Sequence, residues 1–165
     1  MSMGMSKIVK TVSSVVFPFI VIYGLYIIAH GHLTPGGGFQ GGAVVASGCA
    51  MLLVAHGSIW TIGKIREKQL SILESTGAVA FILLALLGLV FGTVFFKNFL
   101  VGNKFLFGEI PGYLSRVANF NTGGVLPLMN FAVGLKVIAG LFAIVLVMAY
   151  ATSTFKKGEM EDGKR

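Results

Sequence analysis

Four long apolar runs dominate the pattern along the chain, and shorter stretches that hold most of the charges separate them. The runs extend from about 11 to 29, 39 to 59, 75 to 96 and 130 to 151. Each is close to the roughly 20 apolar residues that a membrane-spanning helix needs. A backbone in lipid must satisfy its own hydrogen bonds, so these runs should be helices. The pattern predicts an all-α fold, with a transmembrane bundle of four helices in one domain (1–155) and a charged tail (156–165).

The composition supports a membrane environment. Apolar residues make up 55% of the chain and charged residues 12%, whereas soluble domains carry about 25% charged residues. The single cysteine, Cys49, lies inside an apolar run and can form neither an internal disulfide nor a metal site alone. The sequence shows no nucleophile–base pair and no cluster of metal ligands. We therefore expect no catalysis, no metal and no cofactor in this chain.

The basic residues predict the orientation in the membrane. The net charge is +7, but the charges lie in the gaps between runs and form no basic stripe, so nucleic acid is not an expected partner. Nine Lys and Arg residues lie in the N-terminal segment, the second loop and the C-terminal tail, against three in the third loop. Because basic residues favour the cytoplasmic side, both termini are predicted to be cytoplasmic.

The third loop, 97–129, is too long and too apolar for a simple connector. Short apolar runs on both sides of Gly102 and Asn103 predict a hairpin. We expect a partly ordered segment that lies at the outer interface or covers a neighbouring subunit. A re-entrant segment is the alternative.

A glycine-rich segment follows the first run. Its central residues are Pro35, Gly36, Gly37, Gly38, Phe39, Gln40, Gly41 and Gly42. The glycines satisfy G-x-G-x-x-G, but a dinucleotide site needs a preceding strand, and here a membrane helix precedes. Glycines permit positive φ and close backbone approach, so the motif is interpreted as a turn that docks against a partner or builds the local structure. Capping an anion is the alternative. Further small residues at four-residue spacing favour close contacts between helices, within the chain and beyond it.

Four residues are candidates for an ion path. Lys136 is the basic residue inside a predicted span, about 9 Å from its outer end at 1.5 Å per residue. It either snorkels to the interface or lies in a hydrated path beside a carboxylate. Glu74 begins the third run and is expected near the opposite side, so a carboxylate paired with Lys136 would belong to another subunit. His30 and His32 lie at the end of the first run and are either a proton relay or ordinary interfacial residues.

Two segments carry a family resemblance. Gly-His-Leu-Thr-Pro-Gly-Gly-Gly-Phe-Gln-Gly-Gly (31–42), directly after a first span, resembles the MnhB family, whose members are small subunits of Mrp-type multisubunit cation/proton antiporters. The stretch Asn-Phe-Ala-Val-Gly-Leu-Lys-Val (130–137) resembles the start of the last helix of that family. Similar subunits occur in the Mrp-like modules of archaeal membrane-bound hydrogenase and sulfane sulfur reductase complexes.

The resemblance implies a multi-pass subunit in the plasma membrane of a prokaryote. It implies other membrane subunits and lipid as partners, and Na⁺ and H⁺ as the transported ions. It assigns pumping to the large subunits, so this chain is expected to help build or line the ion path without catalysis of its own. A scaffold subunit that does not transport is the first alternative. A small independent homo-oligomeric channel is the second.

Overall fold

The computed structural model describes residues 5–33, 35–64, 67–100 and 123–162. The helices are α1 (Lys7–Ala29), α2 (Gly37–His56), α3 (Ser58–Lys64), α4 (Glu67–Gly92) and α6 (Leu126–Asp162). Four of these described helices are long and apolar enough to cross a membrane, and α3 is a short connector. The predicted all-α bundle of four transmembrane helices is confirmed.

The helices extend beyond the apolar runs. The apolar run predicted to begin at residue 75 belongs to a helix that starts at Glu67, and the run predicted at 130–151 belongs to one that runs from Leu126 to Asp162. Hydropathy marks the part of a helix that lies in lipid, whereas capping and local propensity decide where it ends in water. As a result α6 continues into the predicted charged tail, and residues near the predicted span ends lie further inside their helices than expected.

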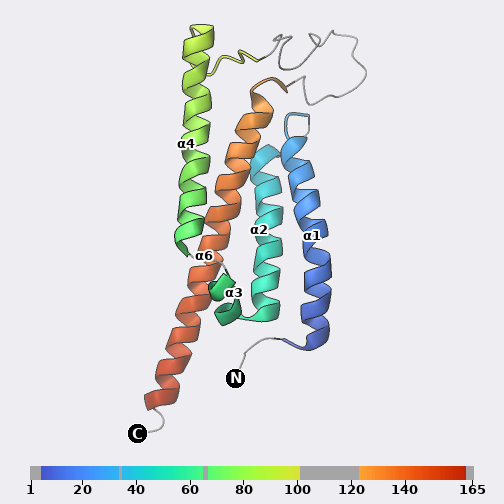
Figure 1. The fold of residues 1–165 in the computed structure, drawn as a ribbon, viewed down its shortest axis with the longest axis vertical. Helices are drawn as coiled ribbons and strands as arrows, with labels where there is room; N and C mark the ends of the chain where they lie inside the picture. Colours follow the sequence, from blue (N-terminus) through green and yellow to red (C-terminus); the bar gives the residue numbers. More distant parts are fainter. Residues whose placement is uncertain (1–4, 34, 65–66, 101–122, 163–165) are drawn as a thin grey trace.

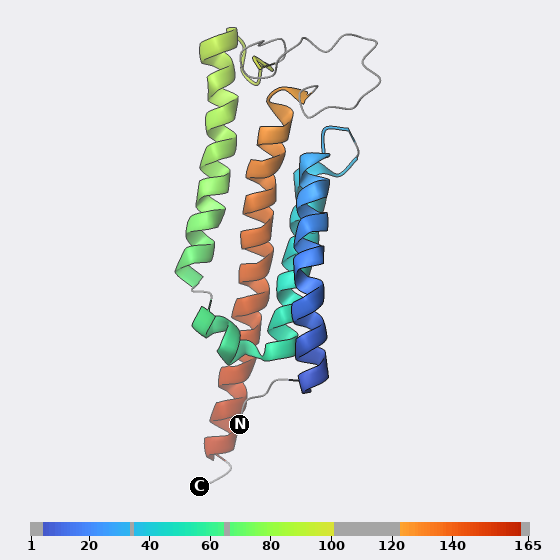
Figure 2. The same cartoon turned by 45° about the vertical axis from the view of Figure 1, so that its right-hand side comes forward.

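The four long helices lie side by side in a curved row. α1 packs on α2, α2 on α6, and α6 on α4, so that α1 and α4 form the two edges (Figures 1 and 2). The beginning of α1 and the end of α6 lie at the same end of the bundle, at the bottom of Figure 1. In α2, 44% of the span is buried, against 17% in α1 and in α4. α2 is therefore the most buried of the four, and the edge helices present most of their surface to lipid or to other proteins.

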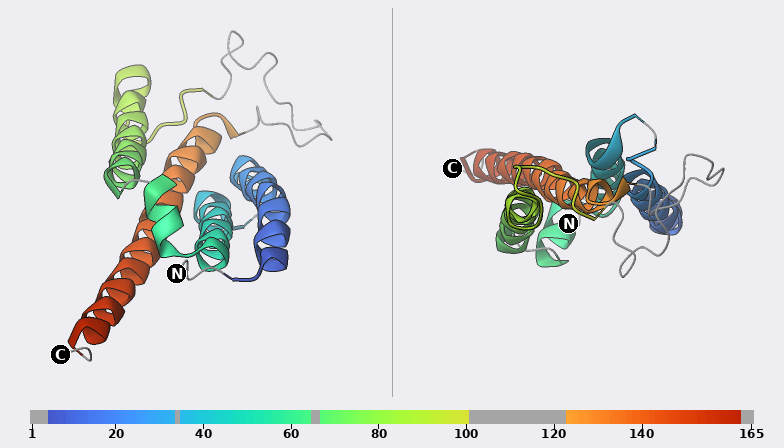
Figure 3. Two further views of the ribbon diagram at one scale, coloured as in Figure 1. Left: turned by 60° about the horizontal axis from the view of Figure 1, so that its bottom comes forward. Right: turned by 90° about the horizontal axis from the view of Figure 1, so that it is seen from above.

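A small apolar core lies at the α3 end of the helix bundle. It joins α2, α4 and α6 through Leu53, Leu70, Phe142 and Leu146, and Cys49 packs against it. α3 lies across this end, between α2 and α4 (Figure 3). This core holds the first turns of α4 against α6.

The segment after α4 folds back along that helix. The Phe96 amide donates to the Ala85 carbonyl oxygen at 3.4 Å, and the backbone of Lys97 fills the notch at Gly88. Asn98 then ties this segment to the start of α6, because its side chain donates to the Gly123 carbonyl at 2.9 Å and accepts from the Val125 amide at 2.8 Å. The predicted hairpin around residues 102–103 lies outside the described residues.

Candidate functional site

The interface between α4 and α6, which we call the α4–α6 seam, is formed by Gly77, Glu74, Ala132, Lys136 and Gly140. A Cβ built on Gly77 would lie 2.7 Å from the Ala132 carbonyl oxygen and 2.9 Å from the Lys136 amide nitrogen. The two backbones therefore touch at this point. Close approach at a glycine is the usual way in which membrane helices associate, because van der Waals packing replaces the hydrophobic effect there.

Glu74 lies one turn along the same interface. Its Cδ and Oε1 atoms are 3.6 Å from the position of a Cβ on Gly140, so the glycine leaves room for the carboxylate. Gly140 is one turn beyond Lys136 on α6. The expectation that Glu74 and Lys136 lie near opposite sides of the membrane is wrong. Gly77 lies against the backbone of Lys136, and Glu74 lies beside Gly140, so the two residues are about one helical turn apart along the seam.

Lys136 lies further inside its membrane-crossing segment than the sequence indicated. It follows the first residue of α6, Leu126, by ten positions, which is about 15 Å along the axis. The spanning part of α6 runs from Leu126 to Thr152, so Lys136 lies close to its midpoint. A four-carbon stem is too short to bring the ammonium group to the interface from this depth. A charge at the centre of a lipid-facing helix costs about 2.5–3.5 kcal/mol on insertion scales.

The side chains of Glu74 and Lys136 leave their helices in opposite directions along the seam. Cα–Cβ bonds tilt toward the N-terminus of a helix, and α4 and α6 run in opposite directions (Figure 1). The Glu74 side chain accordingly leans toward Gly140, whereas that of Lys136 leans toward the start of α6. Lys136 is exposed on the surface of the chain, and Glu74 is half-buried. The seam thus brings a carboxylate and an ammonium group within about a turn of each other without closing them into a pair.

The glycine-rich motif builds the start of α2. Gly36 and Gly37 adopt positive φ values of 119° and 43°, which a residue with a Cβ rarely adopts. The Asn130 side chain of α6 lies between Gly31, in the turn after α1, and Gly37, the first residue of α2. Its Nδ2 is 2.8 Å from a Cβ built on Gly31, and its Oδ1 is 3.0 Å from one built on Gly37. The turn and α6 are therefore fitted to each other through this amide.

The other motif glycines face neighbouring helices of the same chain. Gly38 lies against the Asn130 carbonyl, and a Cβ on Gly42 would be 2.9 Å from the Gly134 oxygen, so both face α6. A Cβ on Gly41 would be 2.5 Å from the Gly24 oxygen of α1. These glycines have a structural role inside the chain.

The exposed residues of the motif point in other directions. Phe39 keeps 61% of its surface exposed, and Pro35, Gly36 and Gln40 are exposed as well. If the motif also docks a partner, Phe39 and Gln40 are the side chains available for it.

The two histidines lie at the end of α1, apart from the α4–α6 seam. His30 follows the last residue of α1, donates its amide to the Tyr26 carbonyl at 2.9 Å, and stacks on the Tyr26 ring with centroids 4.3 Å apart. The His32 ring packs on Gly123, whose Cβ would be 2.9 Å from Cδ2 of the imidazole. The structure brings Glu74 and Lys136 together but places the histidines at the helix end. Within the described ranges, no three His, Cys, Asp or Glu side chains are placed to hold a metal ion.

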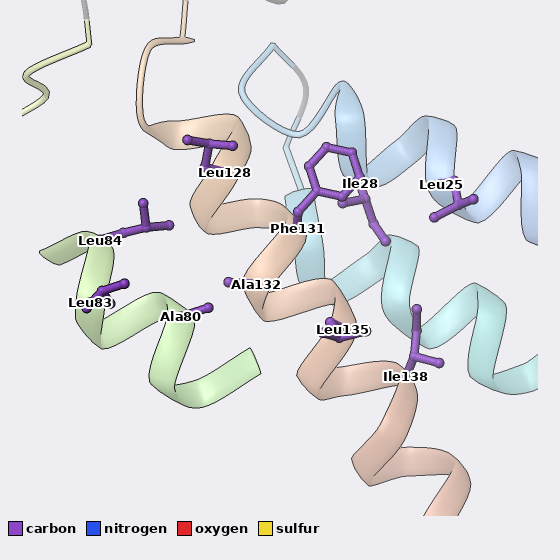
Figure 4. A pocket seen from close by; sticks show the side chains of 10 residues that line it. All are labelled: Leu25, Ile28, Ala80, Leu83, Leu84, Leu128, Phe131, Ala132, Leu135 and Ile138. Carbon is purple, nitrogen blue, oxygen red and sulfur yellow. The ribbon is translucent and has the colours of Figure 1, made fainter. Parts of the chain in front are cut away.

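An apolar groove of about 470 Å³ lies over α6 between the edge helices α1 and α4 (Figure 4). Leu25 and Ile28 form one wall, Ala80, Leu83 and Leu84 form the other, and Phe131 and Leu135 form part of the floor. All of its lining side chains are hydrocarbon, so the groove offers packing surface and no polar chemistry.

The sequence did not identify two asparagines that connect helices near the start of α6. Asn130 fits α6 to the glycine turn, and Asn98 joins the end of α4 to the start of α6. Asn130 does carry a signal, because it is a polar residue that opens an apolar run. Asn98 carries none, since its partners lie 25 and 27 residues away.

Comparison with known proteins places the chain in a family. Residues 8–155 match the family described as "Domain related to MnhB subunit of Na+/H+ antiporter". An uncharacterized protein of Methanocaldococcus jannaschii is 34% identical over 147 residues, which are 87% of this chain and 52% of that protein. A Na(+)/H(+) antiporter subunit of Bacillus subtilis is 28% identical over 91 residues, covering 55% of this chain and 63% of its own length. The putative antiporter subunit mnhB2 of Staphylococcus saprophyticus is 28% identical over 76% of this chain and 88% of its own.

A solved structure shares the fold. A chain of the membrane-bound sulfane sulfur reductase, an archaeal respiratory membrane complex, superimposes with a TM-score of 0.72 at 31% identity. The match covers 89% of this chain and 59% of that one. The chain thus spans little more than half the length of the M. jannaschii protein and of the matched reductase chain. Four membrane-crossing helices and a match over residues 8–155 show that the chain is a multi-pass membrane protein that belongs to the family of domains related to the MnhB subunit of Na⁺/H⁺ antiporters.

Proposed function

We propose that this chain is a membrane subunit of an Mrp-type cation/proton antiporter module and that its α4–α6 seam lines part of the ion path. The names of the B. subtilis and S. saprophyticus relatives support an antiporter, and the reductase structure supports a place in a larger membrane assembly. In this proposal the transported ions are Na⁺ and H⁺. The chain has a binding and positioning role and no catalytic role of its own.

The observation that carries the proposal is the pair of charged residues in the membrane interior. Glu74 and Lys136 lie inside the two membrane-crossing segments Glu67–Phe91 and Leu126–Thr152, and glycines on both helices leave space beside them. Charged groups are costly in a membrane, and where they occur they commonly mark ion or proton paths. A carboxylate can hold and release a proton or a cation.

The proposed orientation places both ends of the chain in the cytoplasm of a prokaryote. The excess of Lys and Arg on that side supports it. The test uses a Cys49→Ser background with single cysteines introduced as Ser6→Cys or Leu33→Cys. A membrane-impermeant maleimide added to whole cells should label the Leu33→Cys protein and spare the Ser6→Cys protein. The reverse labelling would overturn the orientation.

The surrounding assembly is either a free-standing antiporter or a ferredoxin-dependent respiratory complex of the hydrogenase or sulfane sulfur reductase type. The likeness to the reductase chain supports the second. Mass spectrometry of the native complex, purified through a tag on this chain, distinguishes them, because redox subunits accompany the chain only in a respiratory complex. A chain that purifies without other membrane subunits would contradict both.

Transport provides the functional test. Membrane vesicles from cells that lack this chain should lose Na⁺-dependent proton exchange, and the chain supplied in trans should restore it. Exchange that persists without the chain would contradict the proposed function.

A scaffold subunit that only packs and seals the assembly is the second candidate. The glycines that face α1 and α6 within the chain favour it, since they serve packing alone. The two candidates differ at Glu74: a scaffold tolerates a neutral isostere there, and a path-lining subunit does not.

A further inference from the structure

We propose that the α4–α6 seam is an interface with a second subunit, and that a transmembrane helix of that subunit places a carboxylate against Lys136. This inference rests on the proposed role as a subunit and names the partner of the same site. The partner is defined by its chemistry, an Asp or Glu side chain near the middle of the membrane.

Lys136 lies in the middle part of the membrane-crossing segment of α6. It lies ten residues inside α6, near the midpoint of the segment Leu126–Thr152. Its side chain is exposed on the surface of the chain although its backbone is covered by Gly77 of α4. At this depth the surroundings of the isolated chain are acyl chains, which offer an ammonium group no acceptor. The assembled protein must therefore supply one.

Glu74 is the acid that the α4–α6 seam itself contains. Its carboxylate sits beside Gly140, one turn from Lys136 toward the opposite end of α6. The Lys136 side chain leans the other way, toward the start of α6. Among the described residues no ion pair joins the two. Glu74 thus leaves the acceptor positions around Lys136 open to a group from outside the chain.

The surface of α4 leaves room for a neighbouring helix. α4 is an edge helix with 17% of its span buried. Most of the surface of α4 is therefore open to a neighbouring helix, and the Lys136 side chain is exposed next to it. Charge complementarity at Lys136 then selects a helix that carries an acid.

Site-specific photo-crosslinking in the native complex identifies the neighbour. A photoreactive amino acid replaces Lys136, and in a matched control it replaces Ile144, which is 59% exposed two turns further along α6. We expect the Lys136 position to crosslink to a transmembrane peptide of another subunit, within one helical turn of an Asp or Glu. Crosslinks only to lipid, to this chain, or to a peptide without an acid would overturn the inference.

Charge variants test the pairing itself. Lys136→Glu should lower the amount of assembled complex by about tenfold or more, because two carboxylates would face each other in a region of low dielectric. Lys136→Arg should assemble like wild type. Replacing the crosslinked acid by Lys should restore assembly of the Lys136→Glu chain. Equal assembly of the Lys136→Glu and wild-type chains, or no rescue by the exchange while the chain still accumulates in the membrane, would overturn the pairing.

The two levels of the proposal fail separately. If the wild-type chain purifies without other membrane subunits, the proposed function fails. If those subunits are present and Lys136 contacts none of their acids, only this inference fails.

Discussion

The two sides of α6 use glycine in different ways. On the side of α2, Gly38 and Gly42 bring two apolar helices together, and Asn130 is the polar side chain fitted between them. On the side of α4, Gly77 and Gly140 also allow close approach, but the space they leave lies beside Lys136 and Glu74. The same residue type therefore closes an apolar interface on one side and makes room for charges on the other.

This difference shows which feature points to function. Small residues at four-residue spacing are fully explained by contacts within the chain, so in α2 they do not by themselves indicate a partner. A charged side chain near the middle of a membrane has no such explanation inside the chain. The α4–α6 seam is therefore the part of the molecule where transport and assembly are expected to meet.

The largest effect is expected from Gly38→Leu. A Cβ at this position overlaps the carbonyl of Asn130, and a backbone atom cannot move aside as a side chain can. The overpacking should destabilise the chain by about 3 kcal/mol and strongly reduce its amount in detergent-solubilised membranes, measured by fluorescence-detected size-exclusion chromatography. Ser47→Leu, an exposed position on the same helix, is the control. A Gly38→Leu chain as abundant as this control would contradict the α2–α6 interface.

A smaller loss of stability, with a clear loss of transport, is expected from Gly77→Leu. The added side chain meets backbone atoms of α6 at Ala132 and Lys136, so α4 must shift away from the seam. Because α4 is an edge helix, the contacts among α1, α2 and α6 should survive. The substitution should lower the stability of the chain by about 1–3 kcal/mol. Na⁺-dependent proton exchange per chain should fall. Gly63→Leu, at a glycine with nothing within 4 Å of its Cβ position, should leave exchange unchanged.

The smallest effect is expected from Asn98→Ala. It removes two hydrogen bonds, to Gly123 and Val125, and should cost about 1–2 kcal/mol. Asn98→Asp keeps the acceptor for the Val125 amide and should lose about half as much. The midpoint of thermal denaturation in detergent measures both variants. Identical midpoints for Asn98→Ala and wild type would show that this link does not stabilise the start of α6.

Much of the fold follows from the sequence because membrane helices are dictated by few physical terms. The length and apolar character of the four runs predict the spans, since lipid permits no other regular structure for isolated apolar segments. The positions of Lys136 and Glu74 as intramembrane candidates follow from the same reasoning. The family resemblance of residues 31–42 and 130–137 was confirmed by the match to the MnhB-related family.

The geometry of the site could not be predicted in the same way. Hydropathy does not show that α4 starts at Glu67 or that α6 starts at Leu126, nor that Glu74 and Lys136 lie at neighbouring levels of the α4–α6 seam. It also does not show which helix each glycine faces: Gly41 and Gly42 are neighbours in sequence, yet they contact α1 and α6, respectively. Both properties depend on tertiary packing, which a single sequence does not encode in any local pattern.

The most direct test of the central claim, that the α4–α6 seam lines the ion path, is Na⁺-dependent proton exchange by vesicles that contain Glu74→Gln. Glutamine keeps the shape of the side chain beside Gly140 and removes its charge. Glu67→Gln, at the first residue of the same helix, is the matched control. With the signal normalised to assembled complex, exchange should fall by about tenfold or more for Glu74→Gln and stay at the wild-type rate for Glu67→Gln. Wild-type exchange by the Glu74→Gln complex would contradict the account.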